Sequence, residues 1–165
     1  METDRDAISP ARAEMRKPET ILRRPDRQIE ILVADERLTV THARFCAGER
    51  VAGPHIHHDH TDSFYVLAGE LIFEIGCHAE AVTLTAGGFL AVPPEVPHAF
   101  RVGSRRPARW LTMHTPDGGF AAFMRSIRDG GDVDWDIHPV PRGCVGPLTP
   151  QIVLNCSNGC LQLRQ

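Results

Sequence analysis

Short hydrophobic runs follow one another closely through residues 28–116. They include IEILV, LTVTHARFC, FYVL, LIFEI, AVTL, FLAV, HAFRV and RWLTMH, all rich in β-branched and aromatic residues. Turn-forming stretches such as AGERVAGP, TAGG, PPEVP and GSRRP separate them. Within LIFEI, Leu71, Phe73 and Ile75 alternate with polar positions, as in an antiparallel strand with one buried face. Many short strands with a turn about every ten residues predict an all-β sandwich or barrel.

One amphipathic helix is predicted after the strands, over residues 117–129. Its apolar side chains recur at helical spacing, at Phe120, Phe123, Met124 and Ile127. Asp117 could cap its start, and Gly130 and Gly131 would end it. We expect this helix to lay its apolar stripe on the outside of the sandwich.

The two ends of the chain differ in amino-acid composition from the middle. Residues 1–27 mix charges of both signs with three prolines, which predicts an N-terminal arm lying on the domain. Residues 28–116 form the predicted β-domain, and residues 117–165 the helix followed by an irregular tail. Within the tail, residues 142–165 carry only two charges. There QIVL is an extra strand, part of a loosely ordered end or a dimer contact, and the sequence leaves these alternatives open.

Composition narrows the possible classes of protein. A length of 165 residues suits one domain with a real core. The net charge of -3 does not indicate the positively charged surface of a nucleic-acid-binding protein. No apolar run is long enough for a membrane helix. The N-terminal stretch METDRDAISPARAEMRK lacks the apolar core of a signal peptide, so export is not expected. The odd count of five cysteines then predicts reduced thiols in the cytoplasm, and Cys156 and Cys160 alone do not make a structural zinc site.

Candidate chemistry is concentrated in PHIHHDHTDSFYVLAGEL, which places four histidines and two aspartates within residues 55–62. His55 and His57 would point to the same side of a strand, and Asp62 could return beside them after a short turn. His98, which follows the proline-rich turn PPEVP, is the best candidate for a third imidazole. Imidazoles with a carboxylate suit zinc, iron, manganese, nickel or cobalt. The competing interpretation is a solvated turn.

The other histidines are weaker candidates. His58 or His60 could supply a further imidazole if Asp62 does not reach the ion, but their place in the turn predicts that both face water. His114 shares strand parity with Trp110, so it either lines a pocket or closes the last strand at the surface. The rest have no partners in the sequence and are expected to be structural or exposed: His42, His78 and His138.

Two stretches resemble the paired motifs of the cupin superfamily. PHIHHDHTDSFYVLAGEL is similar to G-x5-H-x-H-x3-4-E-x6-G, and GGFLAVPPEVPHAFRV to G-x5-P-x-G-x2-H-x3-N. Matched residue by residue, His55, His57 and His98 fall on the motif histidines, and Asp62 falls on the glutamate. Together the motifs cover roughly residues 53–102. The flanking strands and late helix also resemble small single-domain cupins of the quercetin-dioxygenase-like kind.

This sequence departs from the motifs at three positions. Asp62 has a carboxylate arm one methylene shorter than glutamate, so it would ligate after a strand shift or orient an imidazole from outside. Glu95 stands where the family has glycine, at a turn position that favours positive φ; a side chain there costs about 1 kcal/mol, or the turn differs. Val102 replaces the motif asparagine.

The resemblance implies a jelly-roll sandwich that holds one divalent metal ion, with iron, zinc, manganese and nickel as candidates. It favours a dioxygenase-type enzyme acting on an aromatic or polyketide-like small molecule. The alternatives are a non-oxidative, zinc-type polyketide cyclase or isomerase, and a non-catalytic small-molecule-binding cupin. A homodimer is also expected. The predicted apolar wall of the pocket is Phe64, Val66, Phe73 and Phe100.

Overall fold

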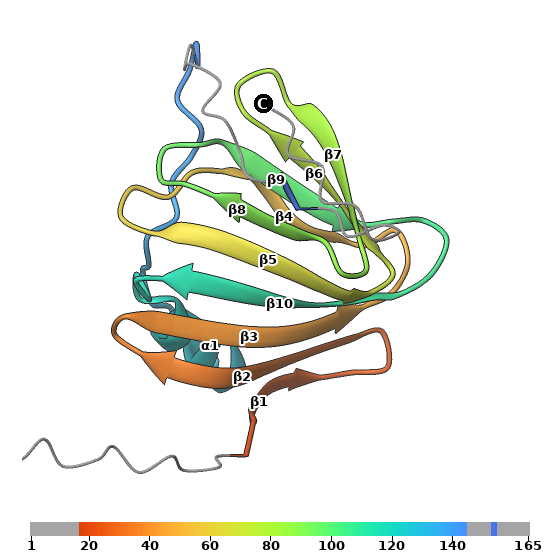
Figure 1. Cartoon of the computed structure of the whole chain (residues 1–165). Helices are drawn as coiled ribbons and strands as arrows, with labels where there is room; N and C mark the ends of the chain where they lie inside the picture. The colour runs from red at the N-terminus through yellow and green to blue at the C-terminus, as the bar shows by residue number, and fades with distance from the viewer. Residues whose placement is uncertain (1–16, 145–152, 155–165) are drawn as a thin grey trace, which may run out of the picture.

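The computed structural model describes residues 17–144 and 153–154 (Figure 1). Its strands, in chain order, are β1 (Glu19–Arg23), β2 (Arg27–Asp35), β3 (Leu38–Phe45), β4 (Arg50–His55), β5 (Thr61–Ala68), β6 (Glu70–Ile75), β7 (Glu80–Thr85), β8 (Phe89–Val92), β9 (His98–Val102), β10 (Ala108–Thr115) and β11 (Val153–Leu154). The helix α1 (Phe120–Asp129) lies between β10 and β11 in the sequence.

The strands form two antiparallel sheets. The larger has seven strands in the order β1-β2-β3-β10-β5-β8-β11, and the smaller has four in the order β4-β9-β6-β7. The chain crosses from one sheet to the other between β3 and β4, and back again between β4 and β5, as in a jelly roll (Figure 1). The antiparallel β-sandwich with one late helix that the sequence predicts is therefore confirmed.

The main core lies between the two sheets and is rich in aromatic rings. Phe64 of the larger sheet contacts Phe73 and Phe100 of the smaller sheet, with ring centroids 4.9 and 5.0 Å apart. Trp110 closes the cluster beside Phe45, at a centroid distance of 5.4 Å. Each fully buried side chain of this size contributes about 1.5–3 kcal/mol, so the alternating pattern seen in the sequence fixes which face of each sheet turns inward.

Helix α1 begins and ends close to its predicted limits. Asp117 acts from two residues upstream of the Gly119 N-cap: its carboxylate accepts hydrogen bonds from the backbone N–H of Gly119 and of Ala121, at 3.1 and 3.0 Å. At the other end, Gly130 adopts φ 76° and stops the helix. The predicted cap and stop are thus both present, although Asp117 lies outside the helix itself.

The position of α1 corrects one expectation. Phe120 and Met124 pack with Ile21 of β1 and Ile31 of β2 in a second buried cluster. Ile31 pairs with Thr41, whose side chain faces the space between the sheets, so the helix lies on this inner face of the larger sheet. It lines a cavity there instead of covering the outside of the sandwich, and Ile127 at the end of its stripe is 49% exposed.

A segment after α1, residues 131–144, runs back toward the β4–β5 turn, and we call it the strap. It is attached in the middle by two backbone hydrogen bonds, Ile56 N–H to His138 O at 3.0 Å and His138 N–H to Ile56 O at 2.9 Å. At its end a disulfide joins Cys144 to Cys77 in the β6–β7 turn. The expectation that all five thiols are reduced is wrong for this pair, because the fold brings their Cα atoms to 5.3 Å.

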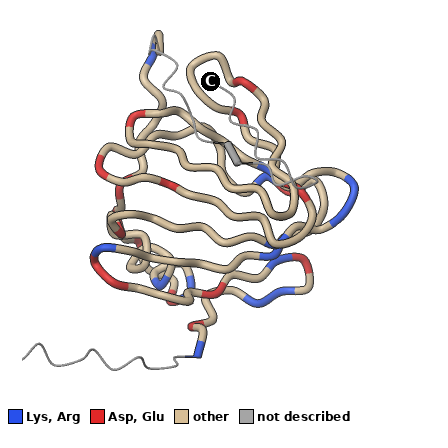
Figure 2. The backbone as a smooth tube through the Cα atoms, viewed as in Figure 1, with Lys and Arg blue, Asp and Glu red and all other residues tan. Residues whose placement is uncertain are grey.

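The two ends of the chain add strands to the larger sheet. β1 falls within the segment expected to be an arm, and it pairs with β2 at one edge. β11 pairs with β8 at the other edge, as expected if QIVL forms an extra strand. Cys156 and Cys160 lie outside the described residues. Within the described part of the chain no helix is long and apolar enough to cross a membrane. Charged residues lie both on the strands and in the turns between them (Figure 2).

Candidate metal centre

Four side chains that the motifs single out converge between the two sheets. His55 ends β4 and pairs across the smaller sheet with His98, the first residue of β9. His57 follows two residues later, and Asp62 enters from β5 of the larger sheet. One potential ligand atom from each of the four lies within 4.8 Å of the others, and all four side chains are buried. The structure thus brings together the four side chains that the sequence singles out, although His57 lies two residues beyond the end of β4.

The three imidazoles are held in the same tautomer. Their Nδ1 atoms donate hydrogen bonds to backbone carbonyls: His55 to Gly53 O at 2.7 Å, His98 to Val96 O at 3.1 Å, and His57 to Asp136 O. Because a carbonyl oxygen only accepts, the proton of each neutral ring is on Nδ1 and the lone pair is on Nε2. All three rings are thus prepared to donate an Nε2 lone pair to an ion.

The carboxylate of Asp62 faces these lone pairs. Its Oδ2 lies 3.3 Å from His57 Nε2 and 3.4 Å from His98 Nε2. His57 Nε2 is buried and has no hydrogen-bond partner among the described residues. Electron-rich atoms that face one another in a buried space are stabilised by a cation placed between them, so this donor set fits a divalent metal ion.

Burial and neighbouring charges shift the pKa values in the direction that metal binding requires. Burial, and then the neighbouring His98, lowers the pKa of His55 to about 4, which keeps this ring neutral at pH 7. Burial alone would raise the pKa of Asp62, but the surrounding imidazoles, His114 foremost, hold it well below its ordinary value. A neutral imidazole and an ionised carboxylate are the forms that bind metal.

His60 corrects the expectation that the turn histidines face water. Its side chain is fully buried, with Nδ1 2.7 Å from Asp136 Oδ2 and Nε2 3.6 Å from Asp62 Oδ1. Burial lowers the pKa of His60, but its contacts with these two carboxylates outweigh burial and raise it. His58, by contrast, is half-exposed as expected, and its Nδ1 lies 2.6 Å from Glu95 Oε1.

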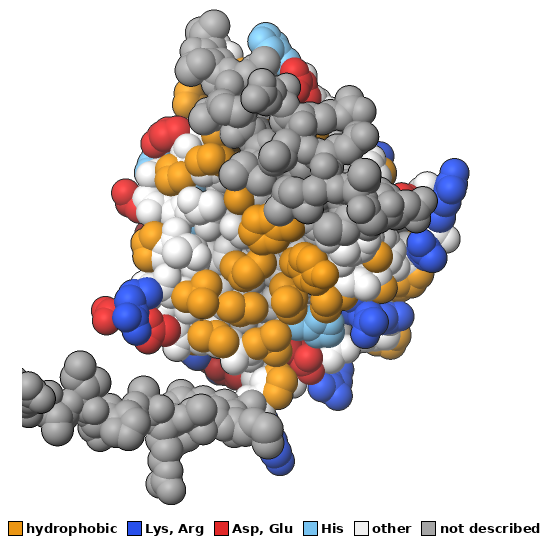
Figure 3. Space-filling view, viewed as in Figure 1, with side chains coloured by type: hydrophobic (Ala, Val, Ile, Leu, Met, Phe, Trp, Pro, Cys, Tyr) orange, Lys and Arg blue, Asp and Glu red, His pale blue; other side chains and the backbone are white. Residues whose placement is uncertain are grey.

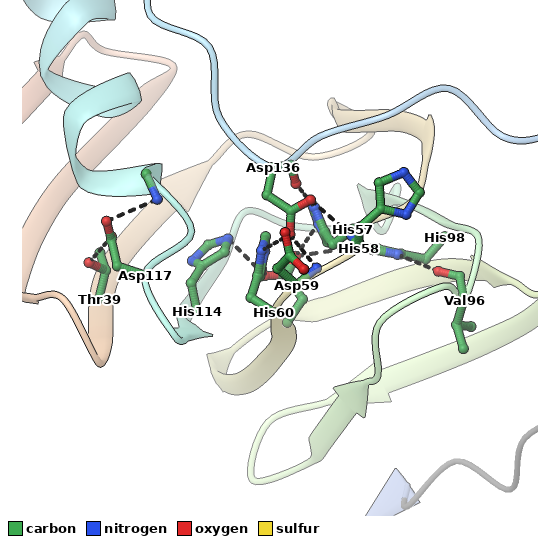
Figure 4. Close-up of polar contacts among 12 residues, drawn as sticks. Thr39, His57, His58, Asp59, His60, Val96, His98, His114, Asp117 and Asp136 are labelled. Atoms are coloured by element: carbon green, nitrogen blue, oxygen red, sulfur yellow. Dashed lines mark hydrogen bonds and ion pairs between the residues drawn. The ribbon is translucent and has the colours of Figure 1, made fainter.

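Asp136 in the strap organises the whole β4–β5 turn (Figure 4). Its carboxylate accepts hydrogen bonds from the backbone N–H of His58 and of Asp59, at 2.9 and 2.8 Å, in addition to the contact with His60. Its backbone carbonyl is the acceptor for His57. These backbone hydrogen bonds outweigh burial and lower the pKa of Asp136. The sequence offers no signal for this role, because Asp136 lies in an irregular segment far from the turn.

The structure shows which of the remaining histidines line the cavity and which are structural. His114 on β10 is 2% exposed, lines the cavity and pairs directly with Asp62 across the sheet. His138 is partly exposed and lies 3.0 Å from Asp136, and His42 is partly buried beside Glu30, so both are structural. Glu95 adopts φ 65°, the conformation that glycine would take at this motif position, and its backbone N–H donates to His57 O at 2.7 Å.

A cavity of about 550 Å³ opens beside the four side chains. Its walls are mostly apolar and aromatic, and His55, Asp62 and His114 contribute polar groups. Phe64 and Phe100 line it as predicted, whereas Val66 and Phe73 lie in the main core. The volume and the mix of an apolar wall with a few polar groups are typical of a small-molecule site.

Comparison with known proteins agrees with the fold. A family model described as "Cupin domain" matches residues 41–114. KdgF from a Halomonas species is 21% identical with a TM-score of 0.51, covering 59% of this chain and 87% of that one. A conserved Klebsiella pneumoniae protein with a double-stranded β-helix domain is 18% identical with a TM-score of 0.50, covering 58% and 81%. The polyketide cyclase RemF from Streptomyces resistomycificus is 21% identical with a TM-score of 0.49, covering 64% and 78%. No curated protein matches the sequence.

The matched residues run from β3 to β10 and include both motifs with every residue of the converging set. Residues 41–114 therefore match a cupin domain, and the described part of the chain folds as a jelly roll of this kind. At these identities the first two of these solved structures establish the fold alone.

Proposed function

We propose that His55, His57 and His98 bind one divalent metal ion through Nε2, with Asp62 Oδ2 as the fourth ligand. The observation that carries the proposal is the common tautomer of the three rings: each Nδ1 donates to a backbone carbonyl, which leaves three Nε2 lone pairs near one carboxylate oxygen. Three imidazoles and a carboxylate leave open positions in an octahedral sphere, so a small molecule could also bind there.

The proposed activity is that of a metal-dependent enzyme acting on an aromatic or polyketide-like small molecule. The cavity supports this substrate class because Phe100, Trp110 and Trp135 present aromatic surface beside the proposed ligands. The Trp135 indole N–H is buried without a hydrogen-bond partner among the described residues, so it could donate to a substrate oxygen. When bound, the ion would supply Lewis-acid or redox chemistry, while these side chains orient the substrate and exclude water.

A dioxygenase-type reaction is the first candidate. One observation favours the non-oxidative alternative, a cyclase or isomerase: His114 Nε2 borders the cavity 2.7 Å from Asp62 Oδ1, where it could move a proton during enolisation.

Metal analysis of the purified protein, followed by turnover assays, tests the proposal. Near-stoichiometric iron and oxygen consumption with polyphenols would support a dioxygenase. Conversion of poly-β-ketone substrates without oxygen would support a cyclase. Ligand binding without turnover under either condition would leave a non-catalytic binding protein, and protein that binds no divalent metal after reconstitution would refute the proposed centre.

Homodimer formation is part of the same proposal. Hydrophobic side chains gather on the outer face of the larger sheet (Figure 3), and there Tyr65 and Leu67 of β5 are 38% and 39% exposed. Such a face is suited to pairing with a second copy. Sedimentation equilibrium at tens of micromolar should give twice the chain mass, and a monomer mass would argue against it.

A further inference from the structure

The second oxygen of Asp62 faces a different pair of histidines. Oδ2 faces His57 and His98, whereas Oδ1 lies 2.7 Å from His114 Nε2 and 3.6 Å from His60 Nε2. One potential ligand atom each from His60, Asp62 and His114 lies within 4.8 Å of the other two. The set is as well buried as the first: the three side chains are 0%, 5% and 2% exposed.

One buried nitrogen on this side lacks a protein partner. His60 donates from Nδ1 to the Asp136 carboxylate at 2.7 Å, which leaves a lone pair on Nε2 when the ring is neutral. His60 Nε2 is buried and has no hydrogen-bond partner among the described residues, and it faces Asp62 Oδ1, which also contacts His114 Nε2 at 2.7 Å. A buried polar atom without a partner is costly, so a group that satisfies His60 Nε2 is expected here.

We infer that His60, His114 and Asp62 Oδ1 form a second divalent-cation site, in which His114 Nε2 is a ligand and not the proton carrier considered for the cyclase alternative. Asp62 then bridges two ions, one on each oxygen. The inference rests on the proposed function, because both sites share this carboxylate. Two imidazoles and one carboxylate form a donor set with open coordination positions, and ions bridged in paired catalytic sites lie about 3.5–4 Å apart.

The second site also borders the substrate cavity. His114 and Asp62 both line it, and His114 is held in place by stacking on Phe120 of α1 at a centroid distance of 3.7 Å. Two divalent ions carry more charge than the Asp62 and Asp136 carboxylates neutralise. This excess favours a substrate with adjacent anionic oxygens, such as a catecholate or an enolised β-diketone, which could contact both ions.

A protonated His60 is the competing explanation. An imidazolium between Asp62 and Asp136 would satisfy the same atoms without a second ion, and metal stoichiometry separates the two. Metal-free protein, prepared by chelation, is titrated calorimetrically with Mn²⁺ at pH 8. Bound metal is then counted by mass spectrometry after desalting.

Wild type is expected to bind two ions per chain, and His60→Ala and His114→Ala one each. His42→Ala, which removes a partly buried histidine outside both sets, should keep two. Electron paramagnetic resonance of the fully loaded wild type needs no variant: a spin-coupled Mn²⁺ pair is expected in place of the six-line spectrum of an isolated ion.

Three results would overturn the inference. One ion in wild type, with a six-line spectrum, would leave the first centre intact and refute the second. Two ions that persist in both His60→Ala and His114→Ala would place the second ion elsewhere. No bound ion in folded wild type would refute the first centre as well.

Discussion

At the residue scale, the geometry of the centre depends on which ring nitrogen carries the proton. The i, i+2 spacing pointed to His55 and His57, although β4 ends at His55, and the proline-rich turn before His98 pointed to that residue. Asp62 was identified by the motif and reaches the cluster despite its shorter arm. Sequence reasoning failed at His60, because its burial depends on Asp136, which no local pattern connects to the β4–β5 turn.

Removal of a proposed ligand should release the ion from the first centre. We expect His57→Ala and His98→Ala each to weaken divalent-metal affinity by more than about 100-fold, beyond the 10–100-fold typical of groups that only orient ligands. His58→Ala is the control, because its ring is half-exposed and faces Glu95. Calorimetric titration of metal-free protein measures the change. Wild-type affinity in His98→Ala, or a comparable loss in His58→Ala, would contradict the assignment.

The stability of the metal-free protein should fall in mildly acidic solution. The folded-state pKa of His55, about 4, is below its unfolded value near 6.5, so between these values the unfolded chain binds more protons. The contribution of the neutral ring is complete above pH 6.5 and is lost as pH falls toward 4, by at most about 3 kcal/mol.

The His55 contribution can be isolated by comparing urea unfolding of metal-free wild type and His55→Gln from pH 7 to pH 4. The difference between the two proteins should shrink or reverse as the wild-type imidazole is forced to ionise. A difference that does not change with pH would show that the ring is not buried in its neutral form.

At the element scale, the strap completes the site that the strands begin. Short strands and turns were predictable because hydrophobic alternation and proline or glycine punctuation are local properties. The helix was predictable from its spacing, but its place on the inner face was not, since that depends on Ile21 and Ile31 of the first two strands. The strap has neither periodicity nor a motif, and its attachment is entirely tertiary.

Asp136 should control metal affinity without touching the ion. Asp136→Ala removes the acceptor of the His58 and Asp59 backbone N–H groups and the partner of His60. We expect metal affinity to fall about 10–100-fold, as for other groups that orient ligands. Asp136→Asn, which keeps one acceptor oxygen, should recover part of it. Asp134→Asn in the same strap, where the side chain is exposed, is the matched control. Equal affinities in all four proteins would refute this role.

Gly118 should tolerate no side chain, for a reason beyond its backbone angle. It adopts φ 60°, and a Cβ atom there would lie 2.7 Å from His60 Nδ1. Gly48 has a similar φ of 77° but open space around it. Gly48→Ala should cost about 1–2 kcal/mol from strain alone, and Gly118→Ala should cost measurably more because His60 must also move. Thermal unfolding compares them, and equal losses would contradict the clash.

At the scale of the whole molecule, the disulfide ties the strap to the smaller sheet. Cys77 and Cys144 are 67 residues apart, and in the chain-entropy model a loop of this size stabilises the fold by about 4 kcal/mol. We expect Cys77→Ser with Cys144→Ser to lower the free energy of unfolding by up to this amount. Cys46→Ser, which removes the free cysteine of the described residues, should have a smaller effect. An unchanged urea midpoint in the double variant would show that the bond is not formed in solution.

The composition of the chain predicted a thiol state that the fold contradicts. An odd number of cysteines indicates only that at least one is unpaired; it does not show which cysteines meet. The β6–β7 turn and the end of the strap are neighbours only in the folded molecule. Long-range pairing of this kind, like the meeting of Asp62 with His114, depends on topology, to which local patterns contribute little.

The position of the strap in the sequence also determines when the site can be completed during synthesis. Every proposed ligand of the first ion has been made once residue 98 is added, yet the carbonyl that fixes the His57 tautomer belongs to residue 136 and bonds across 79 positions. A growing chain therefore contains all the proposed ligands before the group that orients the His57 ring has been synthesised. Because contacts between distant residues form late, tight metal capture would mark the end of folding and not its beginning.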